Sequence, residues 1–236
     1  MNDEGVPQTS QSVESTMRLV KHNRIDIAVH TLVAGTSAEA NEAPRPLVLL
    51  HGLGECTPAS VPSGIAWPGP VFGMDFAGHG QSTMPVGGGY TSEILVGDVD
   101  AVIEHLGTPV TLLGRGLGAY VAMVTAAARP DAVHGVVMAD GPGLAGGGVH
   151  PGSRALVRPA DTVGPPDPYA LLELSRDVRP ADYARTFAGY AVEGSDLDTP
   201  LWVASVVRPA WLEAIVGEPG VGDGSVARGL DLYSAN

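Results

Sequence analysis

The chain has 236 residues, which suits one domain or one domain with an inserted lid and excludes two independent catalytic domains. Its 13 basic and 26 acidic side chains leave a formal net charge of −13, which disfavours nucleic acid and anionic membrane surfaces as partners. Cys56 is the only cysteine, so an intramolecular disulfide and a cysteine zinc site are excluded, and we expect neither a metal nor a cofactor. The longest mostly apolar stretch, 116–128, is too short to cross a bilayer.

The predicted elements begin after a polar and acidic segment, residues 1–16, which we interpret as a disordered tail without a secretion signal. From Met17, polar and apolar residues alternate in two runs around His22-Asn23, at 17–20 and 24–32. This alternation predicts a half-buried antiparallel hairpin at a sheet edge.

Short apolar runs then alternate with segments of helical periodicity. Strands are expected at 46–50, 70–74, 109–113 and 133–139, and helices at 90–106, capped by Thr91 or Ser92, and 117–128. A continuous apolar run is typical of a strand that is buried on both faces of a parallel sheet. Residues 17–141 are therefore predicted to form a doubly wound α/β core.

The alternation of predicted strands and helices ends after Asp140, where a segment rich in Gly and Pro precedes two helical patches at 167–176 and 180–191. We interpret 142–198 as a helical lid. Residues 199–236 have two interpretations: a strand at 200–207 and further short elements complete the C-terminal end of the core, or 201–216 forms a long lid helix interrupted at Pro209.

Three glycine-rich motifs follow three predicted strands: His51-Gly-Leu-Gly54, Asp75-Phe-Ala-Gly-His-Gly-Gln-Ser82 and Gly114-Arg-Gly-Leu-Gly118. In this order and spacing, residues 17–141 resemble the α/β-hydrolase superfamily. The resemblance implies a doubly wound, mostly parallel sheet with an N-terminal antiparallel hairpin and a helical lid. It also implies a G-x-S-x-G elbow that carries the nucleophilic serine beside an oxyanion hole of backbone N–H groups.

Two members of the catalytic triad are missing from this pattern. The serine position is Gly116, which has no side chain to form a covalent acyl intermediate. The resemblance places the catalytic histidine after the last strand, yet no histidine follows His150. Cys56 is close to the first motif but not on the elbow, and we interpret it as incidental.

The backbone N–H donors of the first and third motifs remain, and they favour an anion or a carbonyl oxygen. Arg115 is expected to pair with a carboxylate, such as that of Glu55 or Asp140, or to capture a ligand. The predicted ligand-binding residues are His51, Gly52, Leu53, Gly54, Arg115, Gly116 and Leu117.

Three hypotheses for function follow. The first is a cytoplasmic, bacterial protein, small-molecule binding or regulatory, without Ser-His-acid hydrolase chemistry. The alternative is an enzyme, a hydrolase or lyase, that acts on a small carbonyl or ester compound, with Asp140, Glu55 or His150 as a general acid or base and no covalent step. Asp140 is equally expected to cap the turn at Gly141-Pro142. The third is a structural partner that forms a homodimer through the sheet edge or the lid.

Overall fold

The structure is a computed structural model that describes residues 16–35, 44–147 and 164–234. These residues form an eight-stranded sheet with the strand order β1-β2-β4-β3-β5-β6-β7-β8. The strands are β1 (Thr16–His22), β2 (Ile25–Val33), β3 (Leu47–Leu50), β4 (Val71–Met74), β5 (Val110–Arg115), β6 (Val133–Ala139), β7 (Leu201–Val203) and β8 (Val221–Asp223). The helices are α1 (Ser92–Leu106), α2 (Leu117–Ala128), α3 (Pro168–Arg176), α4 (Ala181–Glu193), α5 (Ala210–Glu213) and α6 (Val226–Ser234).

The N-terminal hairpin is confirmed. β1 pairs antiparallel with β2, from Thr16 opposite Thr31 to His22 opposite Ile25, and Asn23 makes the turn with a positive φ of 55°. β2 also pairs antiparallel with β4, whereas every pair from β4 to β8 is parallel. The sheet is therefore mostly parallel with an antiparallel edge, as the sequence predicts.

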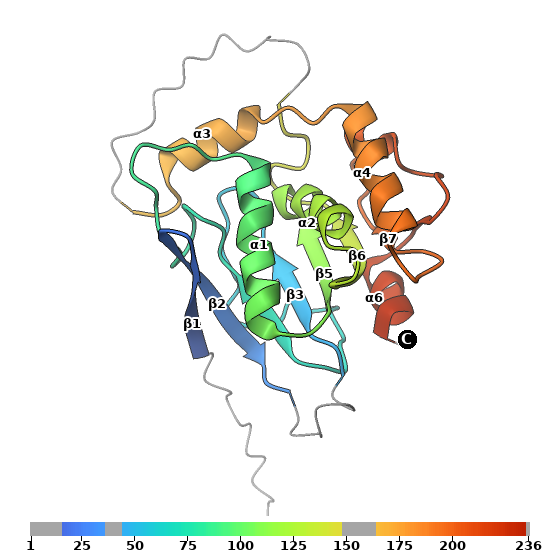
Figure 1. Cartoon of the computed structure of the whole chain (residues 1–236), viewed down its shortest axis with the longest axis horizontal. Helices are drawn as coiled ribbons and strands as arrows, with labels where there is room; N and C mark the ends of the chain where they lie inside the picture. The colour runs from blue at the N-terminus through green and yellow to red at the C-terminus, as the bar shows by residue number, and fades with distance from the viewer. Residues whose placement is uncertain (1–15, 36–43, 148–163, 235–236) are drawn as a thin grey trace, which may run out of the picture.

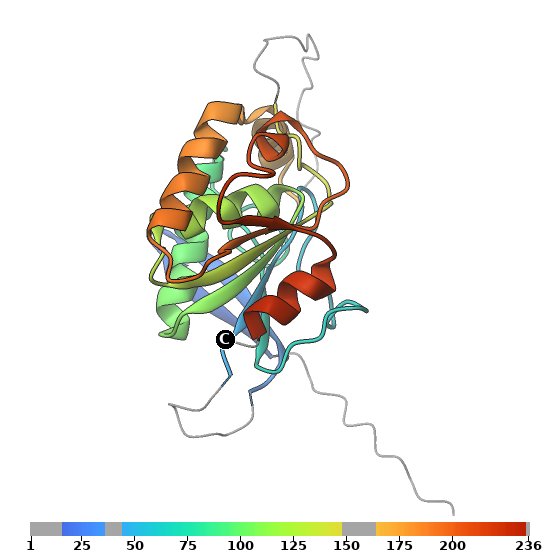
Figure 2. The same cartoon turned by 90° about the vertical axis from the view of Figure 1, so that its right-hand side faces the viewer.

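Helices cover both faces of the sheet (Figures 1 and 2). On one face α1 and α2 lie over a large core that includes Leu50, Val102 and Met123. On the other face α6 closes a smaller core, in which Tyr233 packs against Trp202 and Val137. Because both faces are buried, the central strands read as continuous apolar runs.

The last part of the chain extends the sheet. β7 and β8 pair in parallel beyond β6, and α5 begins only after Pro209. The alternative of a long lid helix over 201–216 is therefore wrong, because Leu201 to Val203 hydrogen-bonds as a strand beside β6. β8 was not predicted, because a strand of three residues that contains Gly222 carries no readable alternation.

The helices α3 and α4 follow the carboxyl ends of the central strands. α3 is tied to the loop before α1, because Glu173 accepts hydrogen bonds from the N–H groups of Gly89 and Tyr90. α4 packs against α2 and α5. α4 therefore lies beside α2 in the helical layer on one face of the sheet, whereas α3 lies near the loop that precedes α1 (Figures 1 and 2).

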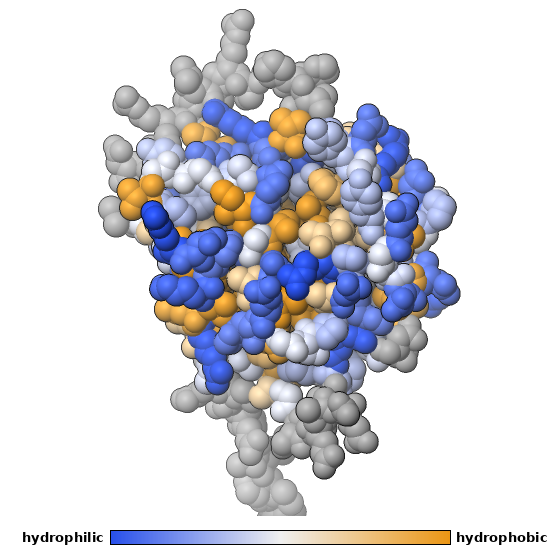
Figure 3. Space-filling model, viewed as in Figure 1, coloured by the Kyte–Doolittle hydropathy of each residue, from blue (hydrophilic) through white to orange (hydrophobic). Residues whose placement is uncertain are grey.

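The surface over α1 and α2 is mixed. Hydrophilic side chains cover most of this face and hydrophobic residues emerge between them (Figure 3), a mixture that is usual for helices that bury one side against a sheet. In the part of the chain that the structure describes, no helix is long and apolar enough to span a membrane.

Candidate functional site

The elbow lies between β5 and α2, with Gly116 at its tip. Gly116 has φ of 59° and ψ of −122°, a conformation that only glycine adopts without strain. A Cβ at this position would clash with the carbonyl oxygen of Pro142 and lie 2.6 Å from the carbonyl carbon of Gly141. The elbow therefore lacks a nucleophile and also lacks the space that a nucleophile would occupy.

The backbone groups that would form an oxyanion hole have an acceptor within the chain. The hole in this fold uses the N–H of the residue after the elbow tip and an N–H from the loop after β3. Here the N–H groups of Leu117 and Leu53 both donate to the carbonyl oxygen of Pro142, each at 2.9 Å. The chain's own peptide thus sits where a substrate's carbonyl oxygen would bind.

A buried arginine holds the loop that carries Pro142. Nη1 of Arg179 donates to the carbonyl oxygens of Gly143 at 2.5 Å and Leu144 at 2.7 Å. Its guanidinium carbon lies 4.7 Å from the ring centroid of Tyr120, and the indole N–H of Trp211 donates to the same Leu144 oxygen. These contacts fix Gly143 and Leu144, the two residues that follow Pro142.

The environment of Arg179 is unusually apolar for a cation. The residue is only 4% exposed, and burial lowers the pKa of its guanidinium to about 10. Its Nε and Nη2 atoms have no hydrogen-bond partner among the described residues. Burying a cation with unpartnered nitrogen atoms costs desolvation free energy. Its burial here fits a role for Arg179 in positioning the loop that carries Pro142.

Two neutral histidines, His51 and His79, hydrogen-bond to the loops of the first two motifs. His51 donates from Nδ1 to the Gly52 oxygen at 2.8 Å and accepts the Phe76 N–H on Nε2 at 3.0 Å. His79 likewise accepts the Gly54 N–H on Nε2 at 3.1 Å. Burial, followed by the proximity of His79, lowers the pKa of His51 to about 4. Both rings therefore join the first two motifs as neutral hydrogen-bonding groups rather than as catalytic bases.

Arg115 pairs with Glu55, as the sequence suggests. Its Nη1 lies 3.2 Å from Oε1 of Glu55, whose other oxygen accepts the Gly52 N–H at 3.0 Å. The neighbouring Cys56 is exposed, and partial burial of its sulfur, together with Asp75 and Glu55, raises the pKa of the thiol. Cys56 thus has little thiolate character, which argues against a nucleophilic role.

Asp140 ties the end of β6 to the loop after β7. It accepts a hydrogen bond from the Ser205 hydroxyl and further ones from the N–H groups of Val206 at 2.8 Å and Val207 at 3.0 Å. Burial alone would raise the pKa of Asp140, but these hydrogen bonds hold it below its usual value. Asp140 is therefore a carboxylate at neutral pH that accepts three hydrogen bonds from the chain.

The resemblance places the catalytic histidine after the last strand, and this chain has no histidine there. β8 is followed by Gly224-Ser225, and the sequence runs on to Asn236 without a histidine. His150 lies outside the described residues. His22 and His30 pair with buried Asp98 and Asp75, each at 2.9 Å, on the hairpin side.

A cavity of about 450 Å³ opens beside the elbow, at the carboxyl ends of β3, β5 and β6. Its walls are mostly apolar, and the charged residues Arg115 and Asp140 also line it. Of the seven predicted ligand-binding residues, His51 and Arg115 line it, whereas Gly52, Leu53, Gly54, Gly116 and Leu117 do not. The other lining residues include Leu49, Ile65, Leu113, Ser225, Val226 and Ala227.

Across the described ranges, no group of three or more His, Cys, Asp or Glu side chains is placed to hold a metal ion. Sequence reasoning also missed two residues that define the site, Pro142 and Arg179. The turn at Gly141-Pro142-Gly143 is visible in the sequence, but the direction of its carbonyl is not. Arg179 carries no signal, because its partners are distant in sequence.

Comparison with known proteins agrees with this fold. A model of the "alpha/beta hydrolase fold" family matches residues 45–196. No curated protein matches the chain. Among solved structures, the haloalkane dehalogenase DatA from Agrobacterium tumefaciens C58 is 21% identical, with 94% of this chain and 97% of that chain covered at a TM-score of 0.61. At this identity the likeness shows the fold alone.

Two further structures align over shorter stretches. An epoxide hydrolase from Vigna radiata is 24% identical, covering 53% of this chain and 38% of its own at a TM-score of 0.41. A hypothetical protein from Pseudomonas aeruginosa PAO1 is 26% identical. The alignment covers 55% of this chain and 44% of that chain at a TM-score of 0.43. This chain thus spans less than half the length of either.

Proposed function

The chain belongs to the α/β-hydrolase fold family, and we propose that it is a small-molecule binding or regulatory protein that lacks the covalent hydrolase chemistry of the triad. The observation that carries the proposal is the contact of Pro142. Its carbonyl oxygen accepts both N–H groups of the hole, so a substrate carbonyl has no donors left to polarise it. Gly116 supplies no nucleophile beside it.

The cavity at the carboxyl edge supports ligand binding. Its volume of about 450 Å³ is within the usual range of roughly 300–1,000 Å³ for small-molecule sites. Apolar walls from Leu49, Leu113 and Val226 favour an apolar body, while the charged lining residues Arg115 and Asp140 favour a polar group in the same ligand. We therefore expect a small, mainly apolar ligand with a hydrogen-bonding end.

The alternative, acid/base catalysis without a covalent step, has less support. Asp140 is held as a carboxylate by three hydrogen bonds, and Glu55 is held by Arg115 and the Gly52 N–H. The pKa of Asp140 is lowered, so its carboxylate is a weak base and has no proton to donate at neutral pH.

Ester hydrolysis tests the loss of covalent chemistry. Purified full-length protein and the Gly116→Ser variant are assayed with p-nitrophenyl acetate and butyrate against a buffer blank. We expect both proteins to stay at background, because the variant still lacks the histidine and its hydroxyl competes with Pro142 for space. Turnover by the natural protein well above the blank would refute the proposal and make Asp140 and Glu55 the next residues to replace.

Binding is tested separately with butyranilide, an uncharged amide with an apolar body, by isothermal titration calorimetry. The Ala227→Trp variant fills the cavity, and Arg228→Trp places the same side chain at the next, exposed position outside it. We expect Ala227→Trp alone to weaken binding, by about tenfold or more. Equal affinity in both variants would mean that the cavity is not the binding site.

A further inference from the structure

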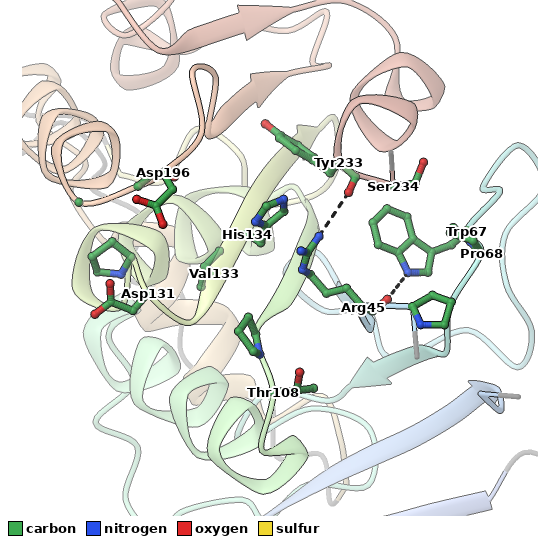
Figure 4. A pocket seen from close by; sticks show the side chains of 15 residues that line it. Arg45, Trp67, Pro68, Thr108, Asp131, Val133, His134, Asp196, Tyr233 and Ser234 are labelled. Carbon is green, nitrogen blue, oxygen red and sulfur yellow. Dashed lines mark hydrogen bonds between the residues drawn. The ribbon is translucent and has the colours of Figure 1, made fainter. Parts of the chain in front are cut away.

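A second and larger cavity, of about 640 Å³, lies at the amino edge of the sheet, where β3, β5 and β6 begin (Figure 4). Three of its side chains are engaged within the chain. Nη1 of Arg45 donates to the Tyr233 carbonyl oxygen at 3.4 Å, and the indole N–H of Trp67 donates to the Arg45 carbonyl oxygen at 2.7 Å. Tyr233 is fully buried, and its hydroxyl donates to the Thr199 oxygen at 2.9 Å. These contacts join α6 to the segment before β3, so this cavity serves the fold.

The two outermost strands of the sheet, β1 and β8, differ in how far their outer backbone groups are protected. β8 has only three residues, and a short outermost strand is one device that keeps two sheets from joining. β1 has seven residues, which pair with β2 in one uninterrupted register from Thr16 to His22. In the part of the chain that the structure describes, no strand pairs with the outer side of β1 (Figure 1). A further strand of equal length can therefore be added there.

The side chains of β1 alternate between the two faces of the sheet. On the face that α1 covers, Val20 is buried in the core and Nδ1 of His22 lies 2.9 Å from Oδ1 of Asp98. On the other face, Met17 and Leu19 are 39% and 55% exposed. Two neighbouring apolar side chains on an outermost strand are thus left in contact with solvent.

The sequence of β1 is complementary to itself. Leu19 is its central residue, so a two-fold axis at Leu19 matches all seven residues of two antiparallel copies. Leu19 then meets the same residue of the second copy, and Met17 meets the aliphatic part of Lys21. Arg18 meets Val20, so no two charges are directly opposite. An axis one position nearer the start of β1 would instead set Arg18 against itself, which is unfavourable.

We propose that β1 is the interface of a homodimer, in which the two eight-stranded sheets join into one continuous sheet with Leu19 at the two-fold axis. An acidic peptide fits the same strand less well, because it would compete with Asp26, which already lies 3.2 Å from Nζ of Lys21. The inference is independent of the proposed function, because β1 contributes no residue to the cavity beside the elbow.

The size of the interface sets its expected strength. A contact limited to β1 lies at or below the low end of the roughly 1,200–2,000 Å² that stable interfaces bury. We therefore expect a weak dimer, with a dissociation constant on the order of 10–100 μM. Sedimentation equilibrium of the natural full-length protein, at concentrations up to about 1 mM, measures this constant. A monomer at every concentration would overturn the proposal.

The charges predict the direction of the salt dependence. Each copy carries a net charge of −13, and the interface brings the cations Arg18 and Lys21 of two copies near one another. Both effects are repulsions between like charges, which salt screens. We expect the dissociation constant to fall by about threefold or more between roughly 0.05 and 0.5 M NaCl. A dimer that salt weakens would be held by opposite charges, and β1 would not be its interface.

Variants at the axis test the register. Leu19→Lys sets a charge against itself and is expected to weaken the dimer by about tenfold or more, as is Leu19→Glu. An equimolar mixture of the two variants is expected to regain the natural affinity, because opposite charges then meet at the axis. Tyr183→Lys introduces the same charge on α4, at a residue that is 62% exposed, and should leave the dissociation constant unchanged.

Thermal unfolding of each variant controls for folding, and the recovery of the mixture cannot arise from unfolded chains. A dimer that Leu19→Lys leaves intact, or a mixture without recovery, would place the interface elsewhere and refute the proposal. Natural protein that stays monomeric but binds poly-L-glutamate through β1 would assign this strand to an acidic partner and refute the homodimer likewise.

Discussion

The two edges of the sheet differ in how their polar groups are satisfied. At the carboxyl edge, the N–H groups of Leu53 and Leu117, the Asp140 carboxylate and the Arg115–Glu55 pair all have partners within the chain. At the amino edge, opposite charges line a larger cavity and the His134 Nε2 atom has no partner in the described chain. The backbone donors beside the elbow thus find acceptors within the chain, whereas the opposite edge buries a histidine nitrogen that has no hydrogen-bond partner among the described residues.

The largest effect is expected where the carboxyl edge is closest packed. Gly116→Ala introduces a Cβ that overlaps the Pro142 carbonyl and a positive φ that alanine resists, so we expect the free energy of unfolding to fall by about 4 kcal/mol in urea titration. The matched control is Gly189→Ala on α4, where a Cβ meets nothing within 4 Å. There we expect a gain of about 0.5–1 kcal/mol, from helix propensity. A loss below about 1 kcal/mol in Gly116→Ala would show that Pro142 leaves the hole easily.

Acid should weaken the same edge through its buried histidines. The folded-state pKa of His51, about 4, lies below its unfolded value of 6.5, so its contribution is complete above pH 6.5 and is lost as the pH falls towards 4. This difference between the folded and unfolded pKa values of His51 corresponds to about 3 kcal/mol in the free energy of unfolding. Asp75 and Asp140, whose pKa values are lowered from 3.8, weaken the fold only below that interval. Urea titrations across the interval, with NMR titration of His51, test this; a flat profile would contradict it.

The loop that carries Pro142 can also be released through Arg179. Arg179→Ala leaves the carbonyls of Gly143 and Leu144 without their charged donor, but it also removes two buried nitrogen atoms, Nε and Nη2, that have no hydrogen-bond partner among the described residues. We therefore expect a net loss of about 2 kcal/mol in the free energy of unfolding. Arg185→Ala, on the exposed side of α4, is the control and should change stability by less than about 0.5 kcal/mol. Faster amide exchange at Leu53 and Leu117 in Arg179→Ala alone would locate the effect; unchanged exchange would mean that Arg179 does not hold Pro142.

A smaller effect is expected at Asp140. In Asp140→Asn one of the two backbone donors, Val206 or Val207, faces the amide NH₂ group and loses its acceptor. We expect a loss of about 1 kcal/mol by thermal unfolding. Asp198→Asn, at an exposed carboxylate, should be neutral. Equal stability of the two variants would show that Asp140 does not anchor the loop after β7.

The smallest effect marks the other edge. Asp196 is exposed and lies on a cavity wall, so Asp196→Asn should change the free energy of unfolding by less than about 0.5 kcal/mol. Thermal unfolding checks this. A larger loss would mean that the charges of the amino edge stabilise the fold, and the contrast between the edges would disappear.

Much of the fold could be predicted from the sequence. Strands such as β3 and β6 are short apolar runs because they are buried on both faces, and α1 begins after its Thr91 cap, which accepts a hydrogen bond from Ile94. β8 could not be predicted, because its pairing with β7 is decided by tertiary contacts rather than by its own three residues.

The candidate site divides in the same way. The missing nucleophile can be predicted, because Gly116 interrupts a local sequence motif. The Arg115–Glu55 pair can also be predicted, because Arg115 ends β5 and Glu55 follows the neighbouring strand β3. The contact of the Pro142 carbonyl with the two N–H groups could not be predicted, because the residue type does not determine the direction of a backbone carbonyl. The amino-edge cavity could not be predicted either, because its lining residues come from segments that are distant in sequence.

The exposed thiol of Cys56 offers a practical handle. It is the only cysteine in the chain and lies three residues after Leu53, whose N–H meets the Pro142 carbonyl. A maleimide dye attached there would report on movement of that loop from a single position. Fluorophosphonate reagents, which need an activated serine, would find no such group at the elbow. In activity-based profiling the elbow of this chain is therefore expected to stay unlabelled, although the chain has the α/β-hydrolase fold.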